Sequence, residues 1–174
     1  LPNDTKPIEL QYALRKAVAA LEPELRRCGA TVSVEAPDVP CRICGRHDEF
    51  QVLFMNLLMN AAEAIAFREK AAAPGQIRVT LGPNATTEHT DDETYLCTVQ
   101  DNGTGMDAET RERAHKLFFT RKTNEPGGGL GLTMVRSILR RQGGSVQFDS
   151  EPGEGTTIKL QIPANLGELC DTPE

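Results

Sequence analysis

Helical and strand-like apolar patterns follow one another in blocks along this chain, and that order constrains its fold more than any other feature. Apolar residues at helical spacing predict helices over residues 10–25, 48–67 and 130–141. Alternating or short apolar runs predict strands over residues 31–35, 41–44, 77–81, 95–99, 145–150 and 156–162. Because the blocks lack regular β-α-β alternation, we expect an α+β fold. Its architecture would be a two-layer α/β sandwich, in which a mixed, mostly antiparallel sheet carries about three helices on one face.

Composition narrows the class of protein further. The 174 residues carry a net charge of −6, which argues against a general nucleic-acid binder. No apolar run approaches the roughly 20 residues of a membrane helix, and no secretory signal is visible. Five cysteines, an odd number, favour a reducing compartment. We therefore expect a cytoplasmic domain that contacts neither nucleic acid nor membrane.

The organisation of the chain is expected to be simple. Residues 1–163 would form one domain with a core of its own, and residues 164–174 a C-terminal tail. The first residue is Leu rather than Met, which suggests a fragment of a longer protein, and that protein could be anchored to a membrane.

Cys41 and Cys44, followed by His47, have the spacing of half a zinc site. A closed structural site needs four ligands, and the other cysteines lie in unrelated segments. We therefore interpret residues 41–44 as a short buried strand, with a zinc site as the alternative.

The helix expected over residues 48–67, which Asp48 could cap, has two faces of different chemistry. Its apolar residues form one stripe, whereas Asn56, Asn60 and Glu63 fall on another. Mg²⁺ prefers oxygen ligands and is often held by few protein atoms together with phosphates and water. Asn60 is therefore a candidate Mg²⁺ ligand, which Asn56 would assist from one turn earlier. The alternative is a pair of solvated surface residues.

Two glycine-rich motifs follow this helix. Asp101-x-Gly103-x-Gly105 stands at the end of an expected strand, where glycines let a flat ligand approach the backbone closely. A carboxylate there can accept a hydrogen bond from an adenine amino group, although an Asx turn would use the same residues. Residues 127–131 precede an expected helix whose exposed N–H groups would bind phosphate. A flexible linker is the alternative for this second motif.

The charged segment 107–127 lies between the two motifs and has the length of a functional lid. Its apolar island, Leu117-Phe118-Phe119, would anchor the lid or belong to the core. Lys122 could reach the phosphates from this lid as a point charge, unless it is merely solvated.

The order of these motifs resembles that of sensor histidine kinases. Asn-x-x-x-Asn, Asp-x-Gly-x-Gly, Phe-Phe-Thr-Arg-Lys and Gly-Gly-Gly-Leu-Gly-Leu are similar to the N box, first glycine box, F box and second glycine box of that family. The similarity covers nearly the whole chain and is greatest to the nitrogen-regulation and oxygen-sensor type of kinase. It implies the Bergerat ATP-binding fold.

The resemblance also implies roles for individual residues. Asn60 would ligate Mg²⁺, with Asn56 assisting. Asp101 would accept a hydrogen bond from adenine, and Thr156 would hold a water near it. The implied catalytic residues are Asn56, Asn60 and Lys122. The implied cofactor-binding residues are Asn60, Asp101, Gly103, Gly105, Lys122, Gly127, Gly129, Leu130, Gly131 and Thr156.

Members of the family are phosphorylated on a histidine of a dimerisation helix. His47, His89 and His115 stand in the wrong contexts for such an acceptor. The resemblance therefore implies a catalytic domain that transfers the γ-phosphate of Mg-ATP to a separate domain. Its implied partners are that dimerisation domain, as a homodimer in the full-length protein, and the receiver domain of a response regulator.

Two other functions remain open. ATPases of the same fold use a Glu four residues before the metal-binding Asn, where this chain has Asn56, a neutral amide that cannot act as a base. Glu63 could replace that base in an ATPase. A degenerate module that binds nucleotide and regulates a partner is the second alternative, and the intact Asn60 and Asp101 argue against it.

Overall fold

The computed structural model describes residues 5–69, 73–85, 93–119 and 130–166, with only the backbone described for residues 117–119 and 130. The helices are α1 (Leu10–Arg27), α2 (His47–Ala66), α3 (Ala108–Phe119) and α4 (Leu130–Gln142). The strands are β1 (Lys6–Glu9), β2 (Ala30–Glu35), β3 (Arg42–Gly45), β4 (Gly75–Pro83), β5 (Thr94–Asp101), β6 (Ser145–Glu151) and β7 (Gly155–Pro163).

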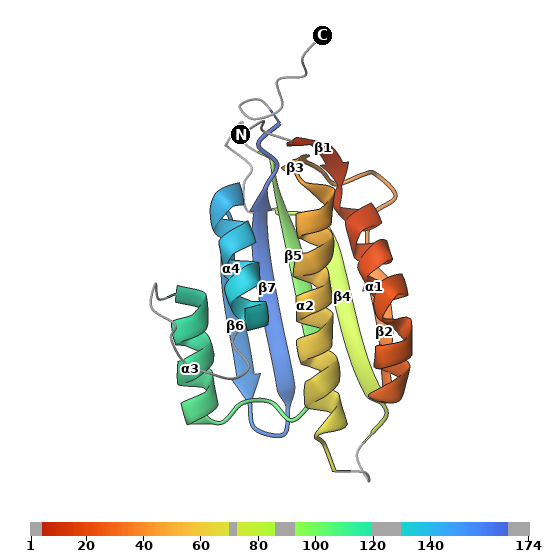
Figure 1. Cartoon of the computed structure of the whole chain (residues 1–174), viewed down its shortest axis with the longest axis vertical. Coiled ribbons are helices and arrows are strands. Elements are labelled where there is room, and N and C mark those ends of the chain that lie inside the picture. Colours follow the sequence, from red (N-terminus) through yellow and green to blue (C-terminus); the bar gives the residue numbers. More distant parts are fainter. Residues whose placement is uncertain (1–4, 70–72, 86–92, 120–129, 167–174) are drawn as a thin grey trace.

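Five strands form one sheet in the order β2-β4-β5-β7-β6. The β2–β4 pair is parallel and the other pairs are antiparallel, while β1 and β3 form a separate antiparallel pair. Helices α1, α2 and α4 cover one face of the sheet, and α3 lies beside α4 near the β6 edge (Figure 1). The predicted two-layer α+β fold is therefore confirmed. The described helices number four rather than about three, because part of the expected lid is the helix α3.

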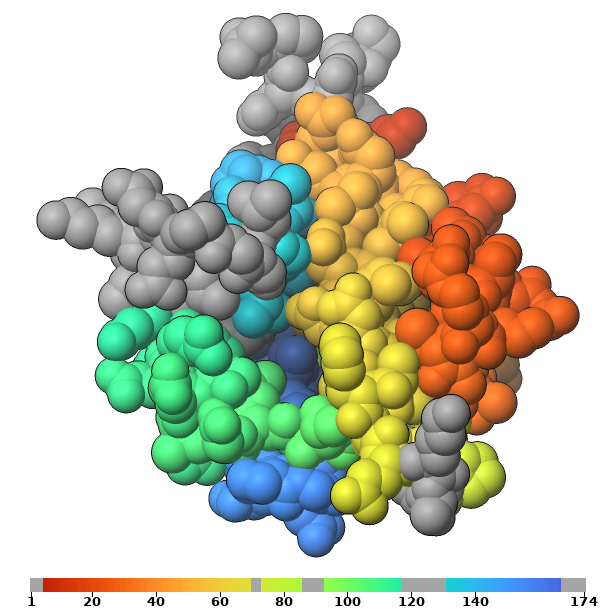
Figure 2. Space-filling model, turned by 60° about the horizontal axis from the view of Figure 1, so that its bottom comes forward, coloured from red at the N-terminus to blue at the C-terminus, as the bar shows by residue number. Residues whose placement is uncertain are grey.

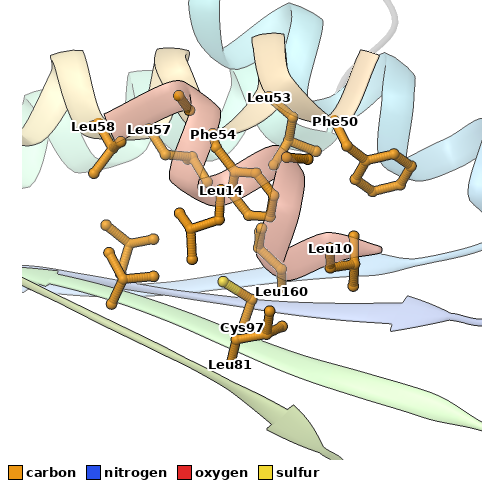
Figure 3. Packing of buried hydrophobic residues seen from close by; sticks show 14 of the residues in the cluster. Leu10, Leu14, Phe50, Leu53, Phe54, Leu57, Leu58, Leu81, Cys97 and Leu160 are labelled. Atoms are coloured by element: carbon orange, nitrogen blue, oxygen red, sulfur yellow. The ribbon is translucent and has the colours of Figure 1, made fainter. Parts of the chain in front are cut away.

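The core lies between α1, α2 and the sheet. Phe50, Phe54 and Leu58 of α2 point toward the strands, and Cys97 and Leu160 of the sheet are buried in the same core (Figure 3). These side chains are at most 1% exposed, and burying one residue the size of Phe54 stabilises the fold by about 1.5–3 kcal/mol. This packing fixes which face of α2 is turned away from the sheet, and so where its polar residues lie.

The two long helices differ from expectation at their ends. Asp48 does not cap α2, because the helix begins at His47 and its N-cap residue, Arg46, makes no side-chain capping bond. Asp48 instead pairs with the Arg46 guanidinium at 3.0 Å, and that hydrogen bond lowers the pKa of its carboxyl. In α1, Pro23 neither ends nor splits the helix, which continues to Arg27. Gly29, with φ +70°, makes the turn out of α1.

The small β1–β3 pair is joined to the rest of the domain by buried polar contacts. Gln142, at the end of α4, donates from Nε2 to the carbonyl of Cys44 at 3.0 Å and to that of Pro163 at 2.8 Å. The Cys44 N–H donates to the carbonyl of Ala164, which is 2% exposed. Residues 42–45 form a buried strand, as predicted for Cys41 to Cys44. In the described part of the chain, no group of three or more His, Cys, Asp or Glu residues could hold a metal ion.

Candidate nucleotide site

Three segments that are distant in sequence meet at one face of the molecule. The end of α2, the segment between β5 and α3, and the turn between β6 and β7 lie side by side there (Figure 2). Beside them, part of β7 forms the floor of a hollow between α2 and α4 (Figure 2). Gly103 and Gly105 lie in the segment between β5 and α3, and Asp101 and Thr156 lie in the two strands beside it.

Asp101 is the last residue of β5 and is only 8% exposed. Burial raises the pKa of its carboxyl, while the N–H groups of Gly103 and Thr156 and the positive charge of Arg68 lower it. The Gly103 N–H donates to Oδ1 at 2.8 Å, which is the Asx-turn bond that the sequence left open. The turn is therefore present, and it contains an acceptor group that is almost removed from water.

The turn after Asp101 is fixed by hydrogen bonds to its neighbours. Asn102 Oδ1 accepts from the Gln76 N–H at 2.8 Å, and its Nδ2 donates to the Pro74 carbonyl at 2.9 Å. The Thr104 N–H donates to the carbonyl of Ala64 in α2 at 3.1 Å. The Asn102 bonds hold the Asp101 turn against the start of β4, and the Thr104 bond holds it against α2, one helical turn after Asn60.

Gly103 and Gly105 are required by close packing. A Cβ at Gly103 would lie 2.6 Å from the Ala64 Cβ and 2.8 Å from the Ala64 carbonyl carbon, so only glycine fits against α2. Gly105 has φ +68°, and a Cβ there would collide with the carbonyl oxygen of Glu151. The glycines thus let the turn contact α2 on one side and the β6–β7 turn on the other.

The polar face of α2 borders the start of α4. Asn56 and Asn60 are partly exposed and Glu63 is exposed, as expected for a face turned away from the core. Asn56 donates from Nδ2 to the Val52 carbonyl at 2.9 Å. A Cβ at Gly131 would lie 2.7 Å from Asn56 Oδ1, so the first turn of α4 packs against this amide. The structure therefore brings the first and last motifs of the sequence together.

Several predicted site residues lie outside the described residues. They are Lys122, Gly127, Gly129 and the side chain of Leu130. The same holds for the side chains of Phe118 and Phe119, although their backbone forms the end of α3. Their predicted roles remain predictions.

Thr156 lies opposite Asp101 in the β5–β7 register and is 7% exposed. Its Oγ1 is 2.8 Å from the hydroxyl of Ser150, a residue that the sequence analysis missed. A polar residue at an inward position of β6, two residues after Phe148, was the available indication of a buried hydroxyl there. Arg68, whose charge acts on Asp101, carried no such indication in the sequence.

The sequence of this chain is similar to those of known nucleotide-binding and sensor proteins. Residues 45–166 match the family described as histidine kinase-, DNA gyrase B-, and HSP90-like ATPase. The sensory histidine kinase/phosphatase NtrB of Rhizobium meliloti is 32% identical over 98% of this chain, which spans 44% of that protein. The C4-dicarboxylate transport sensor protein DctB of Pseudomonas aeruginosa is 27% identical over 96% of the chain, which spans 26% of that protein.

Solved structures share the fold. A catalytic domain of the histidine kinase ThkA matches with a TM-score of 0.69 at 22% identity, covering 92% of this chain and 98% of that domain. A mycobacterial sensor histidine kinase, MprB, matches with a TM-score of 0.65 at 22% identity, covering 91% and 97%. Within the described residues, no helix combines the length and the apolar character needed to cross a membrane.

Proposed function

The chain belongs to the family of histidine kinase-, DNA gyrase B- and HSP90-like ATPases, and from this membership we propose that it is the ATP-binding catalytic domain of a two-component sensor histidine kinase. It would bind Mg-ATP and present the γ-phosphate to a histidine on a separate dimerisation domain. The relatives reported above are sensor proteins of which this chain spans less than half, which is consistent with one domain of a longer protein.

The observation that carries the proposal is the buried Asp101 carboxylate in its glycine turn. It is 8% exposed and is held by N–H donors, beside the helix that bears Asn56 and Asn60. A carboxylate in this setting can accept a hydrogen bond from the exocyclic amino group of adenine. Guanine presents a carbonyl oxygen at that position, which a carboxylate would repel. Adenine selectivity is the expected result.

The remaining residues fit a metal-bound triphosphate. Asn60 is partly exposed on the polar face of α2, and its amide oxygen is the kind of ligand that Mg²⁺ accepts. Gly131 lies in the first turn of α4, and the N–H groups and dipole at a helix N-terminus favour phosphate. Lys122, Gly127 and Gly129 would complete the phosphate contacts. Bound Mg-ATP supplies the phosphoryl group, and the protein's part is positioning and charge stabilisation.

Asn56 favours phosphoryl transfer over hydrolysis. Hydrolysis needs a base that takes a proton from water, and the Asn56 amide, bonded to the Val52 carbonyl, cannot do so. Transfer to a histidine needs no such base from this domain. An ATPase remains the second candidate because Glu63 is exposed on the same helix. Water activated by Glu63 would then release free phosphate.

The proposed partners follow from the reaction. The phospho-acceptor would lie on the protein's own dimerisation domain, in a homodimer, and a response regulator receiver domain would take the phosphoryl group next. Mg²⁺ is the proposed metal and the cytoplasm the proposed compartment, where ATP is available.

Calorimetry with this chain tests the proposal directly. ATP should bind in the presence of Mg²⁺ more tightly than in EDTA, and GTP should bind weakly or not at all. Asn60→Ala should remove most of the Mg²⁺ dependence, whereas Asn84→Ala, in a strand-end turn away from the site, is the matched control. A chain that binds no ATP under either condition would eliminate both the kinase and the ATPase.

A further inference from the structure

Ser150 is a buried residue near the site whose hydroxyl has three hydrogen-bond partners. It lies in β6 and is 2% exposed. Its Oγ is 2.9 Å from the Met106 N–H, 3.0 Å from the Gly155 carbonyl oxygen and 2.8 Å from Thr156 Oγ1. A hydroxyl offers one proton and two lone pairs, so these three partners use its full capacity. These bonds link β6 to the segment before α3 and to the start of β7.

The first side of this network is the segment that leads into α3. Met106 immediately precedes Asp107, whose carboxylate caps the first turn of α3 by accepting from the Thr110 N–H at 2.8 Å. Arg111 of α3 donates from Nη1 to the Ser150 carbonyl at 3.3 Å. Both the side chain and the backbone of Ser150 therefore contact the start of the helix that follows the base pocket.

The second side of the network is the base pocket itself. Thr156 pairs with Asp101 between β5 and β7, and its N–H faces the Asp101 carboxylate. Gly155, which accepts from Ser150, packs so closely on the Asp101 carbonyl that a Cβ would not fit. A continuous set of hydrogen bonds thus runs from the backbone before α3, through Ser150, to the residue opposite Asp101.

We propose that Ser150 is a positioning residue for nucleotide binding, whose hydroxyl fixes Thr156 and the segment before α3 relative to the Asp101 carboxylate. The inference rests on the proposed function, because it takes Asp101 as the group that binds adenine. Ser150 touches no nucleotide itself. It acts by keeping the two walls of the base pocket, the 102–106 turn and the start of β7, in one arrangement.

Removing the hydroxyl has a specific consequence. Ser150→Ala leaves the Met106 N–H and the Gly155 carbonyl without this partner, the first part-buried and the second buried, which is unfavourable for both groups. The segment before α3 should then open more often. ATP should bind less tightly because the pocket is ordered only part of the time.

The experiment compares Ser150→Ala with Ser145→Ala in this chain. Ser145 is in the same strand, and its hydroxyl makes one exposed bond, 3.2 Å from Gln161 Oε1, so it controls for loss of a strand hydroxyl. The first readout, without nucleotide, is amide hydrogen exchange over residues 103–107. The second is the ATP dissociation constant. Ser150→Ala should raise exchange in that segment and weaken ATP binding by about tenfold, and Ser145→Ala should change neither.

A double-mutant cycle with Thr156→Val, which keeps the shape of Thr156 and removes its hydroxyl, tests the connection. The two substitutions should weaken ATP binding together by less than the product of their separate effects, because each breaks the same network. Should Ser150→Ala not fold, the nearly isosteric Ser150→Cys takes its place with the same expectations.

Any one of three results would overturn the role of Ser150. The first is that Ser150→Ala leaves exchange over residues 103–107 unchanged, and the second is that it binds ATP within twofold of the wild type. The third is that Ser150→Ala and Thr156→Val act independently in the double-mutant cycle. These failures are distinct from failure of the proposed function, in which the unsubstituted chain itself binds no ATP. In that case the positioning role for nucleotide falls with it, while the exchange data still report whether Ser150 orders the turn.

Discussion

Replacing Asp101 by asparagine separates two effects of the buried charge: it lowers the stability of the fold, and it accepts a hydrogen bond from the bound nucleotide. The carboxylate is 8% exposed, and burial raises its pKa above the ordinary value of 3.8. Well below this ordinary aspartate pKa, the group is neutral in both the folded and the unfolded chain. As the pH rises, the unfolded chain ionises first, so the folded state loses stability until the pH exceeds the raised pKa. This cost is present at pH 7, and Asp101→Asn removes it.

The magnitudes follow from the bonds that the substitution changes. The amide can keep the oxygen that accepts from the Gly103 N–H but loses one acceptor for a second N–H, which costs about 1 kcal/mol at every pH. The charge-dependent part has the opposite sign and grows between about pH 4 and pH 7. Binding behaves differently, because a hydrogen bond from adenine to a carboxylate contributes about 1.5–3 kcal/mol. Its loss corresponds to about a 10- to 150-fold weaker affinity for ATP.

The assay combines unfolding and binding on the same samples. In urea unfolding at about pH 4 and pH 7, Asp101→Asn should gain stability relative to the wild type as the pH rises. In calorimetry it should bind ATP more weakly and discriminate less against GTP. Asp107→Asn is a control of opposite sign. The side-chain and backbone hydrogen bonds of Thr110 lower the pKa of Asp107, so that variant should lose stability relative to the wild type as the pH rises. The reasoning is refuted if Asp101→Asn binds ATP normally, or if its relative stability falls between the two pH values.

Three further predictions test the glycine packing, the metal ligand and the core. In urea unfolding, Gly105→Ala should destabilise the fold by more than Gly143→Ala. Both glycines have a positive φ, which costs about 1–2 kcal/mol for a residue with a Cβ. Only at Gly105 would the new Cβ also collide with a carbonyl oxygen. Equal losses would show that the turn adapts. Asn60→Ala in the full-length protein should lower the rate of phosphoryl transfer by about a hundredfold or more while ATP binding falls less, and normal autophosphorylation would contradict its assignment. Phe54→Ala, at a fully buried position, should lower the free energy of unfolding by about 3–5 kcal/mol. A loss below about 1 kcal/mol, which is typical of a surface substitution, would contradict the packing described.

The sequence predicted the elements whose apolar periodicity is strong. Helices α1, α2 and α4 and the β6–β7 hairpin appear close to the expected residues, because each buries a regular stripe or an alternating face. Strand β1, residues 6–9, was missed because four residues with one buried side chain carry no usable period. Helix α3 was missed for a related reason: Ala114 is its only buried side chain among those described, so its sequence reads as a charged loop.

The apolar periodicity of the sequence could not predict contacts between distant segments. The parallel β2–β4 pairing joins Val32 to Ile77, and nothing in either run specifies a parallel partner. In the site, the turn after Asp101 could be predicted, because an aspartate followed by alternating glycines at a strand end is typical of an Asx turn, and the structure contains that bond. The bonds of Ser150 to Met106 and Thr156 could not, because they depend on how the β6–β7 turn lies against the β5–α3 segment.

Phosphoryl transfer in trans tests the central claim most directly. This chain would be mixed with Mg²⁺, ATP labelled in the γ-phosphate, and a separately produced dimerisation domain of the same protein. The account predicts that label appears on a histidine of that domain, in an acid-labile form, and only with Mg²⁺ present. Release of labelled free phosphate without any labelled histidine would contradict it and would identify the domain as an ATPase.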